Sequence, residues 1–390
     1  MKQFLEGADA IARTVALCRP GVISAYPITP QTHIVENLAD LIAQGKLQCQ
    51  FVNVESEHSA ASCVLGASAA GVRAYTSTSS QGLLLMAEVL FNIAGIRLPV
   101  VLCCVNRAVS APINIWNDQQ DIMAVRDAGM VQLFAESVQE SCDLHLQAFK
   151  IGEDPDIMLP VVVNIDGFTL SHGFEAVEFP EQSAVDVFLP AYRAPYKLDV
   201  NNPMTLGPLC GPEYYLEQRY AIQETLNREV MAKVQKVADE FTAAFGRKAF
   251  GLLEEYRMED AETVLLSFGS LCGTLKEAAD ALRAKGRKVG VVRLVTYRPF
   301  PKEALVRALA KAKDVLVFEK CISLGADGPV YTEVTSALYG AGAKVAVNGY
   351  VCGLGGRDVA LDEILAAVDA RERVSAKFMN VKQENLGSFI

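Results

Sequence analysis

Polar side chains follow four short apolar segments in the first third of the chain, at the points where those segments end. The four groups are Tyr26–Pro30, Val54–Ser59, Thr76–Gly82 and Asn106–Arg107. Short apolar runs bounded by turn-forming or polar residues are typical of buried strands. Ligands of open parallel α/β sheets bind at the carboxyl ends of strands, so these groups are placed to bind one. We expect Thr76–Gly82 to be a hydroxyl-rich loop that enters a helix.

Three side chains in these groups suit binding or catalysis. Pro27 and Pro30 restrict the backbone on both sides of Thr29, which holds its hydroxyl in a set direction. Glu57 lies at the expected start of an alanine-rich helix, and Arg107 leaves a buried strand, where a guanidinium can bind a carboxylate. Each also has a purely structural interpretation: a helix cap, a charge at a helix N-terminus, or an ion pair.

Alternating strands and helices are expected to position these groups. The pattern predicts a parallel sheet with helices on both faces. Strands are expected at 22–25, 48–54, 73–76, 99–105, 131–135 and 159–165, and helices at 7–18, 32–43, 56–70, 81–93, 121–127 and 140–151.

A proline-rich stretch separates this region from a second α/β unit. Six prolines between 170 and 212 interrupt the alternation and predict a long ordered connector or arm, followed by one or two long helices at 213–244. At ~150 residues per domain, 390 residues fit two or three domains. We therefore predict open, mainly parallel α/β domains at 1–169 and 256–390, joined by the connector and helices at 170–255. In the second domain strands are expected at 263–267, 288–294, 314–318 and 344–349, and helices at 271–285, 302–312, 329–339 and 361–369.

The composition argues against nucleic acid and membrane partners. The net charge is −10 and no lysine-rich block is present. The N-terminus lacks the apolar centre of a signal peptide, and the most apolar region, 82–105, is interrupted by polar residues before it reaches the ~20 residues of a membrane span. We expect a soluble, cytoplasmic protein.

The sequence predicts no metal site in this chain. None of the ten cysteines forms a C-x-x-C pair, which zinc ribbons and iron–sulfur clusters nearly always contain. Most cysteines have apolar neighbours, as expected for core thiols in a reducing compartment. The four histidines, at 33, 58, 145 and 172, show no metal-ligand spacing, and His58 either lines the site beside Glu57 or is solvated. The glycine run Gly353–Gly356 lacks the G-x-G-x-x-G spacing of a dinucleotide site and favours close packing or a subunit contact.

Together, these motifs resemble the alpha subunits of the 2-oxoacid:ferredoxin oxidoreductases, most closely the pyruvate type. The resemblance implies a thiamine diphosphate-binding pyrimidine-type fold for the first domain and a transketolase C-terminal-like fold for the second. It covers nearly the whole chain, through Tyr26–Pro30, Ser56-Glu57 with Gly66-Ala67, Ser80–Met86, Asn106–Ala108, Asn117–Asp121, Ile165–Phe168 with Ser171-His172, Arg293 with Tyr297–Pro301, and Gly353–Asp358.

The resemblance also implies the roles of single residues. Glu57 matches the glutamate that hydrogen-bonds the pyrimidine ring and favours its imino tautomer, which removes the thiazolium C2 proton. Thr29 matches a residue near the oxo group and carboxylate of the 2-oxoacid, and Arg107 one that holds the substrate by charge. The other expected cofactor contacts are Pro27, Ile28, Gln81 and Leu83.

By the same resemblance, this chain supplies only half of a cofactor site. Ile165-Asp166-Gly167 lacks the first glycine of the Gly-Asp-Gly segment that holds Mg²⁺ and the diphosphate. A beta subunit is therefore expected to bring the diphosphate site, Mg²⁺ and a [4Fe–4S] cluster. Gamma and delta subunits, or their equivalents, would bring further clusters and contacts to coenzyme A. We expect a dimer of the hetero-complex that reduces ferredoxin, and an isolated chain that is inactive.

Two positions depart from the pattern of the family. Gln31 stands where serine is common and Gln119 where histidine is common. Asn106 beside the arginine leaves the substrate open. Thr29 favours pyruvate-like substrates. Asp118 and Asp121 are expected to order the loop over the site.

The predicted reaction converts pyruvate, coenzyme A and oxidised ferredoxin to acetyl-CoA, CO2 and reduced ferredoxin, in either direction. The alternatives are a subunit specific for 2-oxoisovalerate or 2-oxoglutarate, a non-catalytic scaffold, and a nicotinamide-dependent dehydrogenase. A scaffold has no need of Glu57, Thr29 and Arg107 together.

Overall fold

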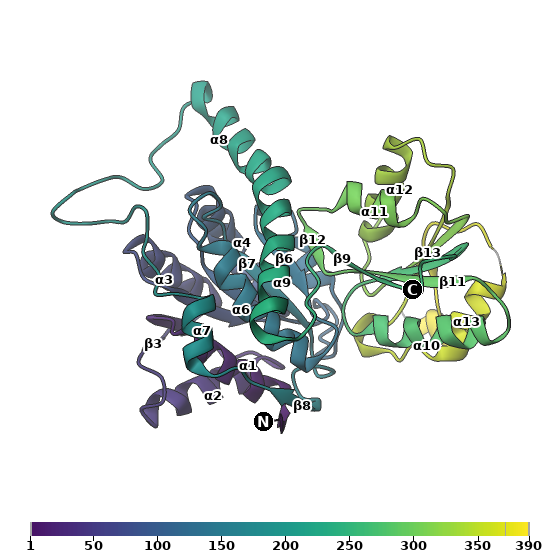
Figure 1. The fold of residues 1–390 in the computed structure, drawn as a ribbon, viewed down its shortest axis with the longest axis horizontal. Coiled ribbons are helices and arrows are strands. Elements are labelled where there is room, and N and C mark those ends of the chain that lie inside the picture. The colour runs from purple at the N-terminus through teal and green to yellow at the C-terminus, as the bar shows by residue number, and fades with distance from the viewer. Residues whose placement is uncertain (1, 371, 389–390) are drawn as a thin grey trace. The chain divides into compact units, whose positions relative to one another are not determined.

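The computed structural model describes residues 2–370 and 372–388, and the chain divides into two compact units. The first unit is Met1–Glu254 with Leu294–Pro301, and the second is Glu255–Arg293 with Lys302–Ile390. The first unit thus includes the proline-rich connector and a short segment from the region assigned on sequence to the second domain. Each unit contains its own large β-sheet (Figure 1).

The seven-stranded sheet of the first unit carries the candidate residues. Its strand order is β12-β6-β7-β5-β4-β2-β3. Six strands run parallel, and β12 pairs antiparallel with β6. Every residue of β4, β5, β6 and β7 is buried, as expected for strands covered on both faces. The strands are β2 (Val22–Ala25), β3 (Gln50–Asn53), β4 (Ala74–Thr78), β5 (Val101–Asn106), β6 (Val131–Phe134), β7 (Val161–Asp166) and β12 (Thr296–Arg298).

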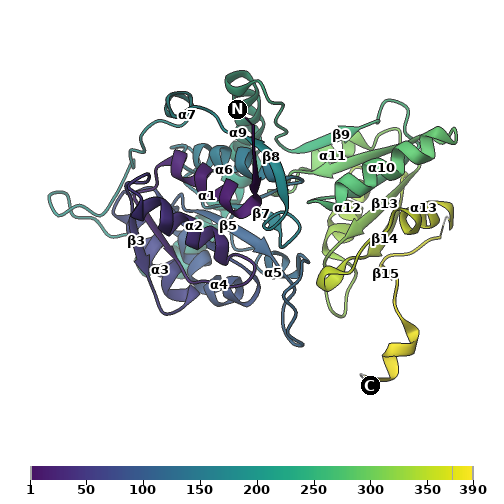
Figure 2. The same ribbon diagram turned by 90° about the horizontal axis from the view of Figure 1, so that it is seen from below.

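Helices pack in two groups around this sheet (Figure 2). One group is α1 (Gly7–Cys18), α2 (Thr32–Ala43) and α6 (Val138–Gly152), and the other is α3 (Glu57–Ala69), α4 (Ser80–Gly95) and α5 (Gln120–Ala124). Apolar residues of α1 and α6 share one core cluster with alternate residues of β5 and β7. This arrangement confirms the predicted fold class.

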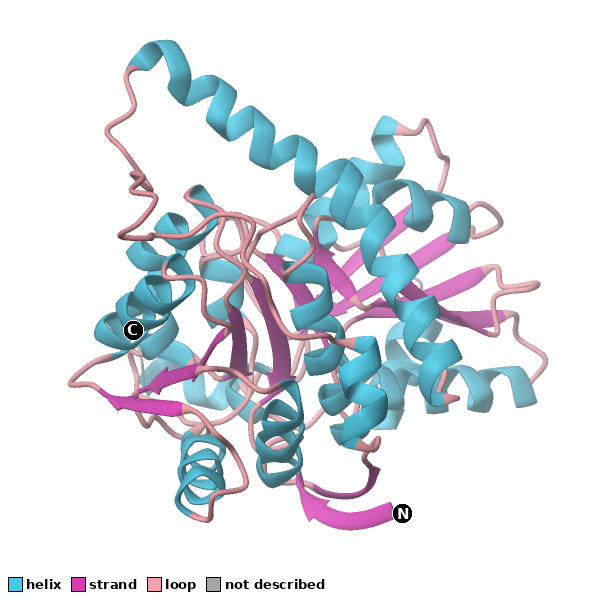
Figure 3. Ribbon diagram, turned by 60° about the vertical axis from the view of Figure 1, so that its left-hand side comes forward, coloured by secondary structure: helices cyan, strands magenta, loops and turns pink. Residues whose placement is uncertain are grey.

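The connector contains two regular elements that the sequence analysis did not name. β1 (Lys2–Glu6) pairs antiparallel with β8 (Phe174–Glu178), and α7 (Gln182–Phe188) follows. Residues 189–211 form a long loop that reaches away from the sheet to α8 (Pro212–Glu224) (Figure 1). α8 continues through a π-helical turn at Thr225–Val230 into α9 (Met231–Phe245), and together they form the long helix expected from the sequence (Figure 3).

The second unit contains a six-stranded sheet of order β15-β14-β13-β10-β11-β9. Its core includes Leu265, Leu275, Val291 and Phe318. The strands are β9 (Leu253–Tyr256), β10 (Thr263–Ser267), β11 (Val289–Leu294), β13 (Asp314–Glu319), β14 (Ala346–Val351) and β15 (Lys377–Phe378). The helices are α10 (Leu271–Ala284), α11 (Lys302–Ala308), α12 (Pro329–Gly340) and α13 (Leu361–Ala370), with 3-10 turns at Leu354–Gly356 and Gln383–Ser388.

One prediction near the candidate site is wrong. β4 extends to Thr78 and α4 begins at Ser80, so Thr76–Thr78 belong to a buried strand and only Ser79 separates strand from helix. The hydroxyl groups of this segment therefore lie inside the protein instead of in a loop.

Candidate active site

The candidate residues meet at the carboxyl ends of adjacent strands. β2, β4 and β5 are neighbours in the sheet, and β3 lies beside β2. Thr29 follows β2, Glu57 follows β3, Gln81 follows β4, and Arg107 follows β5 directly. Because all four strands are parallel, these residues lie at one edge of the sheet, where open α/β sheets bind ligands.

Glu57 is held at the first position of α3 by a capped helix start. The hydroxyl oxygen of Ser56 accepts a hydrogen bond from the backbone N–H of Ser59, at 3.2 Å. The side chain of Glu57 is buried, with 8% of the residue exposed, and the helix N-terminus favours its negative charge. Its carboxylate makes no hydrogen bond or ion pair with any residue in the described ranges. A buried carboxylate without a partner is costly, so a ligand that donates a hydrogen bond to it would be stabilised here.

The first turn of α4 lies against this carboxylate. A Cβ atom on Gly82 would lie 2.7 Å from Oε1 of Glu57 and 2.5 Å from Oγ1 of Thr78, so only glycine leaves room. In the part of the chain that the structure describes, Oγ1 of Thr78, Oγ of Ser79 and Nε2 of Gln81 are buried without a hydrogen-bond partner. Buried polar atoms are nearly always paired in native proteins, with protein, water or a ligand. This set of donors and acceptors around a carboxylate fits the aminopyrimidine end of thiamine diphosphate.

Arg107 joins the ends of two strands and keeps a donor free. Its Nη1 donates to the backbone oxygen of Thr29 at 2.8 Å, and its Nε donates to the backbone oxygen of Asn114 at 2.9 Å. None of the hydrogen bonds among the described residues uses Nη2. Burial lowers the pKa of Arg107, and the nearby carboxylate of Asp121 raises it. The side chain of Thr29 is exposed, so its hydroxyl and Nη2 of Arg107 are both available to an anionic ligand.

Asp121 connects these elements beneath the edge. One oxygen accepts from the backbone N–H groups of Ser80 and Arg107, each at 3.0 Å, and the other accepts from Nδ2 of Asn106 at 3.0 Å. The residue is fully buried, and burial raises the pKa of its carboxyl group to about 6. Asp121 therefore fixes the start of α4 relative to Arg107, in line with the ordering role expected from the sequence.

Two known protein families match long parts of the chain. The sequence profile of a family described as "Pyruvate flavodoxin/ferredoxin oxidoreductase, thiamine diP-bdg" matches residues 13–236. A second profile, "Pyruvate:ferredoxin oxidoreductase core domain II", matches residues 261–364. The chain belongs to the pyruvate:ferredoxin oxidoreductase family.

Individual relatives of this oxidoreductase chain extend over nearly its full length. It is 46% identical to the pyruvate synthase subunit PorA of Methanosarcina barkeri, with 98% of this chain and 97% of that protein covered. It is 40% identical to the ketoisovalerate oxidoreductase subunit VorA of Pyrococcus abyssi, covering 96% and 94%. The 2-oxoglutarate:ferredoxin oxidoreductase structure from Magnetococcus marinus has a similar fold, with a TM-score of 0.71 at 20% identity, and covers 95% of this chain and 65% of that one.

The two unusual glutamines of this oxidoreductase chain are both buried hydrogen-bond donors. Nε2 of Gln31 donates to the backbone oxygen of Ser77 at 2.9 Å and thereby ties the turn after β2 to β4. Nε2 of Gln119 donates to Oδ1 of Asp166 at 2.8 Å. Neither side chain is exposed at the site, so both have structural roles that the sequence did not reveal.

The remaining candidates differ in exposure. Pro27 and His58 are exposed, and Ile28 and Gln81 are half-buried. Leu83 is completely buried. Their contacts with a cofactor stay predictions.

Sequence spacing predicted no metal site, yet the structure brings Glu6, His33 and His172 together.

The second unit places one buried acid at the carboxyl edge of its sheet. Glu319, the last residue of β13, accepts from the backbone N–H of Val330 at 2.9 Å, and burial raises the pKa of its carboxyl group to about 7. Gly353, Gly355 and Gly356 all have positive φ, so the glycine run forms a tight turn after β14 that other residues would strain. No sequence pattern marked Glu319 as a candidate.

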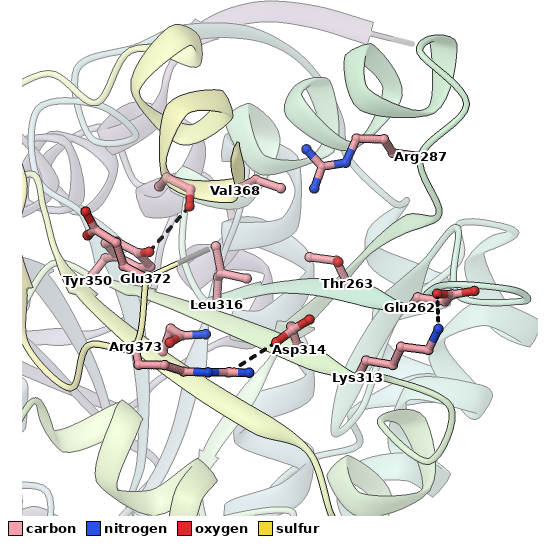
Figure 4. A pocket seen from close by; sticks show the side chains of 12 residues that line it. Glu262, Thr263, Arg287, Lys313, Asp314, Leu316, Tyr350, Val368, Glu372 and Arg373 are labelled. Carbon is pink, nitrogen blue, oxygen red and sulfur yellow. Dashed lines mark hydrogen bonds and ion pairs between the residues drawn. The ribbon is translucent and has the colours of Figure 1, made fainter. Parts of the chain in front are cut away.

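A cavity of about 380 Å³ lies at the opposite edge of this sheet, near the amino ends of β10 and β13 (Figure 4). The charged side chains that line it are paired: Lys313 with Glu262, Arg373 with Asp314, Arg287 with Asp369, and Glu372 with Lys377. This pairing favours a structural role for these charges.

None of the helices in the described ranges combines the length and the apolar character that a membrane span requires.

Proposed function

We propose that this chain is the alpha subunit of a thiamine diphosphate-dependent pyruvate:ferredoxin oxidoreductase. The complex converts pyruvate and coenzyme A to acetyl-CoA and CO2, passes the electrons to ferredoxin, and also runs in reverse. The observation that carries this proposal is the buried carboxylate of Glu57, which faces the start of α4 among unpaired polar atoms.

Residues of this chain would bind and orient the cofactor. Glu57 would accept a hydrogen bond from the pyrimidine ring, and Thr78, Ser79 and Gln81 would offer polar atoms to the same ring. When bound, thiamine diphosphate supplies the nucleophilic carbon and the electron sink for decarboxylation. Burial of Glu57 excludes water from this end of the site and strengthens its electrostatic interactions.

The substrate would be held by Thr29 and Arg107. The exposed hydroxyl of Thr29 donates to the oxo group of pyruvate, and Nη2 of Arg107 binds the carboxylate. Arg107 is anchored through its other nitrogens, so it offers one charged donor instead of a bidentate fork. Such a modest clamp suits a carboxylate that must leave as CO2.

Partner chains would complete the enzyme. We propose a beta subunit with the diphosphate site, Mg²⁺ and a [4Fe–4S] cluster. Gamma and delta subunits, or equivalents, provide further clusters and coenzyme A contacts, in a dimer of the hetero-complex. Exposed apolar side chains at Val200, Leu209, Leu216 and Tyr214 support extensive contacts with other chains. None of the ten cysteines, all of which lie in the described residues, forms a disulfide, which suits the reducing cytoplasm that we propose as the location.

The test is the variant Glu57→Gln in the complex purified with its partner chains. We expect kcat for pyruvate- and coenzyme A-dependent reduction of a viologen dye to fall roughly 10²- to 10⁴-fold. The KM for pyruvate should change little because Glu57 contacts the cofactor. The matched control is Glu55→Gln, which changes an exposed carboxylate two residues away. Full activity of Glu57→Gln would favour a scaffold role for this chain.

The substrate is tested in the same assay. The 40% identity to a ketoisovalerate oxidoreductase subunit makes 2-oxoisovalerate the main alternative to pyruvate. We expect kcat/KM to be highest for pyruvate among pyruvate, 2-oxoisovalerate and 2-oxoglutarate. A titration of the isolated chain with NAD tests the dehydrogenase alternative, for which we expect no binding.

A further inference from the structure

Three residues from distant parts of the sequence meet on the first unit outside the candidate active site. Glu6 ends β1, His33 lies in the first turn of α2, and His172 lies in the turn between β7 and β8. One potential ligand atom from each lies within 4.8 Å of the other two. All three side chains are partly exposed, so an ion from solvent can reach them.

The cluster is already held in place by hydrogen bonds and ring contacts. Nδ1 of His33 lies 2.8 Å from Oε1 of Glu6. The imidazole rings of His33 and His172 are in contact, with centroids 4.6 Å apart and planes tilted by 34°.

The imidazole nitrogens that would bind the ion have different partners. Nδ1 of His33 already faces the carboxylate of Glu6, so an ion bound by both groups would replace the proton between them. Nδ1 of His172 lies 2.8 Å from Oγ of Ser171, which also accepts the backbone N–H of Phe168 at 2.9 Å. In the tautomer whose Nδ1–H donates to this hydroxyl oxygen, Nε2 of His172 carries the lone pair, and metal binding would select that tautomer. Burial and the neighbouring His33 lower the pKa of His172, while Glu6 raises it. Metal-ligating histidines have the same arrangement, in which the second nitrogen bonds a carboxylate, hydroxyl or carbonyl group.

We propose that Glu6, His33 and His172 bind one divalent transition-metal ion of the zinc class. Two imidazole nitrogens and a carboxylate oxygen are a common ligand set for Zn²⁺, with water in the fourth position. Imidazole ligands favour zinc, copper or nickel over Mg²⁺ and Ca²⁺, which prefer oxygen. Metal–ligand bonds of about 2.0–2.2 Å place tetrahedral ligands roughly 3.3 Å apart, so small side-chain rotations would close the present spacing.

The position of the cluster points to a stabilising role. The ion would join β1, α2 and the turn before β8, which are separated by up to 166 positions in the sequence (172 − 6). From His172, ring contacts continue to Phe168 at 4.7 Å and from there to Trp116 at 4.6 Å. Trp116 belongs to the loop whose residue Asn114 holds Arg107. Metal binding would therefore also restrict the loop beside the candidate active site.

The experiment uses the full chain, freed of any affinity tag and treated with a chelator, and Co²⁺ as the probe. We expect one equivalent of Co²⁺ to produce the visible absorption of a four-coordinate site, and Zn²⁺ to displace it. Zn²⁺ should also raise Tm by a few degrees, because it binds the folded state preferentially. Thiolate ligation has a distinct, intense near-ultraviolet absorption, which would identify binding to the free cysteines instead.

Single substitutions show whether Co²⁺ binds at this cluster or elsewhere on the chain. His33→Ala changes a side chain that is 45% exposed, so the chain should fold, and we expect Co²⁺ affinity to fall at least tenfold. His172→Ala should do the same, and Glu6→Gln should weaken binding less. The control His58→Ala removes an exposed histidine outside the cluster and should bind Co²⁺ like the unaltered chain. Equal Co²⁺ affinity in His33→Ala and His58→Ala, or no Co²⁺ absorption in the unaltered chain, would overturn the proposal. None of these readouts depends on activity of the complex.

Discussion

Replacing Gly82 by alanine should disturb the candidate active site through a single methyl group. Gly82 lies in the first turn of α4, where alanine is ordinarily the better helix former by about 1 kcal/mol. The added Cβ would lie 2.5 Å from Oγ1 of Thr78, 2.7 Å from Oε1 of Glu57 and 2.8 Å from its Cγ. Local helix propensity and tertiary packing therefore make opposite predictions for the same substitution.

The extent of steric overlap of the added Cβ decides whether packing or helix propensity has the larger effect on stability. The three contacts fall about 0.7–1.0 Å inside the ~3.5 Å separation of unstrained atoms. Overpacking of this kind costs roughly 1–3 kcal/mol, which exceeds the gain in helix propensity, so we expect a net destabilisation of up to about 2 kcal/mol. Relief requires Glu57 or α4 to move, and a misplacement of about 1 Å at a catalytic group can lower activity about 10²-fold.

The assay compares Gly82→Ala with Gly95→Ala in the same helix. A Cβ on Gly95 meets nothing within 4 Å, so this control should raise stability by up to about 1 kcal/mol and leave activity unchanged. Thermal denaturation of the isolated chain measures stability, and viologen reduction by the complex measures activity. If Gly82→Ala is as stable and as active as Gly95→Ala, then Glu57 does not lie against α4 as described.

Two further substitutions test the residues around Arg107. Arg107→Lys leaves one ammonium group for the backbone oxygens of Thr29 and Asn114 and for the substrate, so kcat/KM for pyruvate should fall roughly 10- to 100-fold, and an unchanged value would exclude substrate binding by Arg107. Asp121→Asn tests the raised pKa. Because the folded state holds the Asp121 proton up to a pKa of about 6, against 3.8 ordinarily, this group loses stabilisation as pH rises between these values. The stability of the unaltered chain relative to Asp121→Asn should therefore decrease by up to about 3 kcal/mol from pH 4 to pH 7, and denaturant titrations that show a constant difference would contradict the buried position of Asp121.

Local patterns were sufficient to predict the alternation of strands and helices but not every boundary. The strand β5 could be predicted from its own apolar run, and the turn around Thr29 from its two prolines, because both signals come from neighbouring residues. The end of β4 depended on pairing with β5, which extends the strand through Thr78 opposite Cys104. β12 has a partner, β6, that lies more than 160 positions earlier, so no local signal marks it.

Some features of the candidate site could likewise be predicted from neighbouring residues, and others only from the folded chain. The position of Glu57 at a helix start follows from Ser56 and the alanine-rich sequence after it, and can be predicted from a few neighbouring residues. Asp121 binds a backbone group 41 positions earlier in the chain, at Ser80, which only the folded chain reveals. The cluster of Glu6 with two histidines is equally non-local, and therefore sequence spacing gave no hint of it.

The unpaired atoms beside Glu57 bear on assembly as well as on catalysis. Each buried hydroxyl or amide without a partner costs roughly 1–3 kcal/mol, and Thr78, Ser79 and Gln81 each contribute one such atom near the start of α4. Domains have a net stability of only about 5–15 kcal/mol, so this cost is a substantial fraction for the first unit. Apolar side chains of similar shape would remove the cost and also the binding groups. A cofactor that pairs with these atoms stabilises the folded state to which it binds, and a partner chain that holds its diphosphate increases that effect. The groups proposed to bind thiamine diphosphate would therefore make the stability of the first unit depend on completion of the site by another chain.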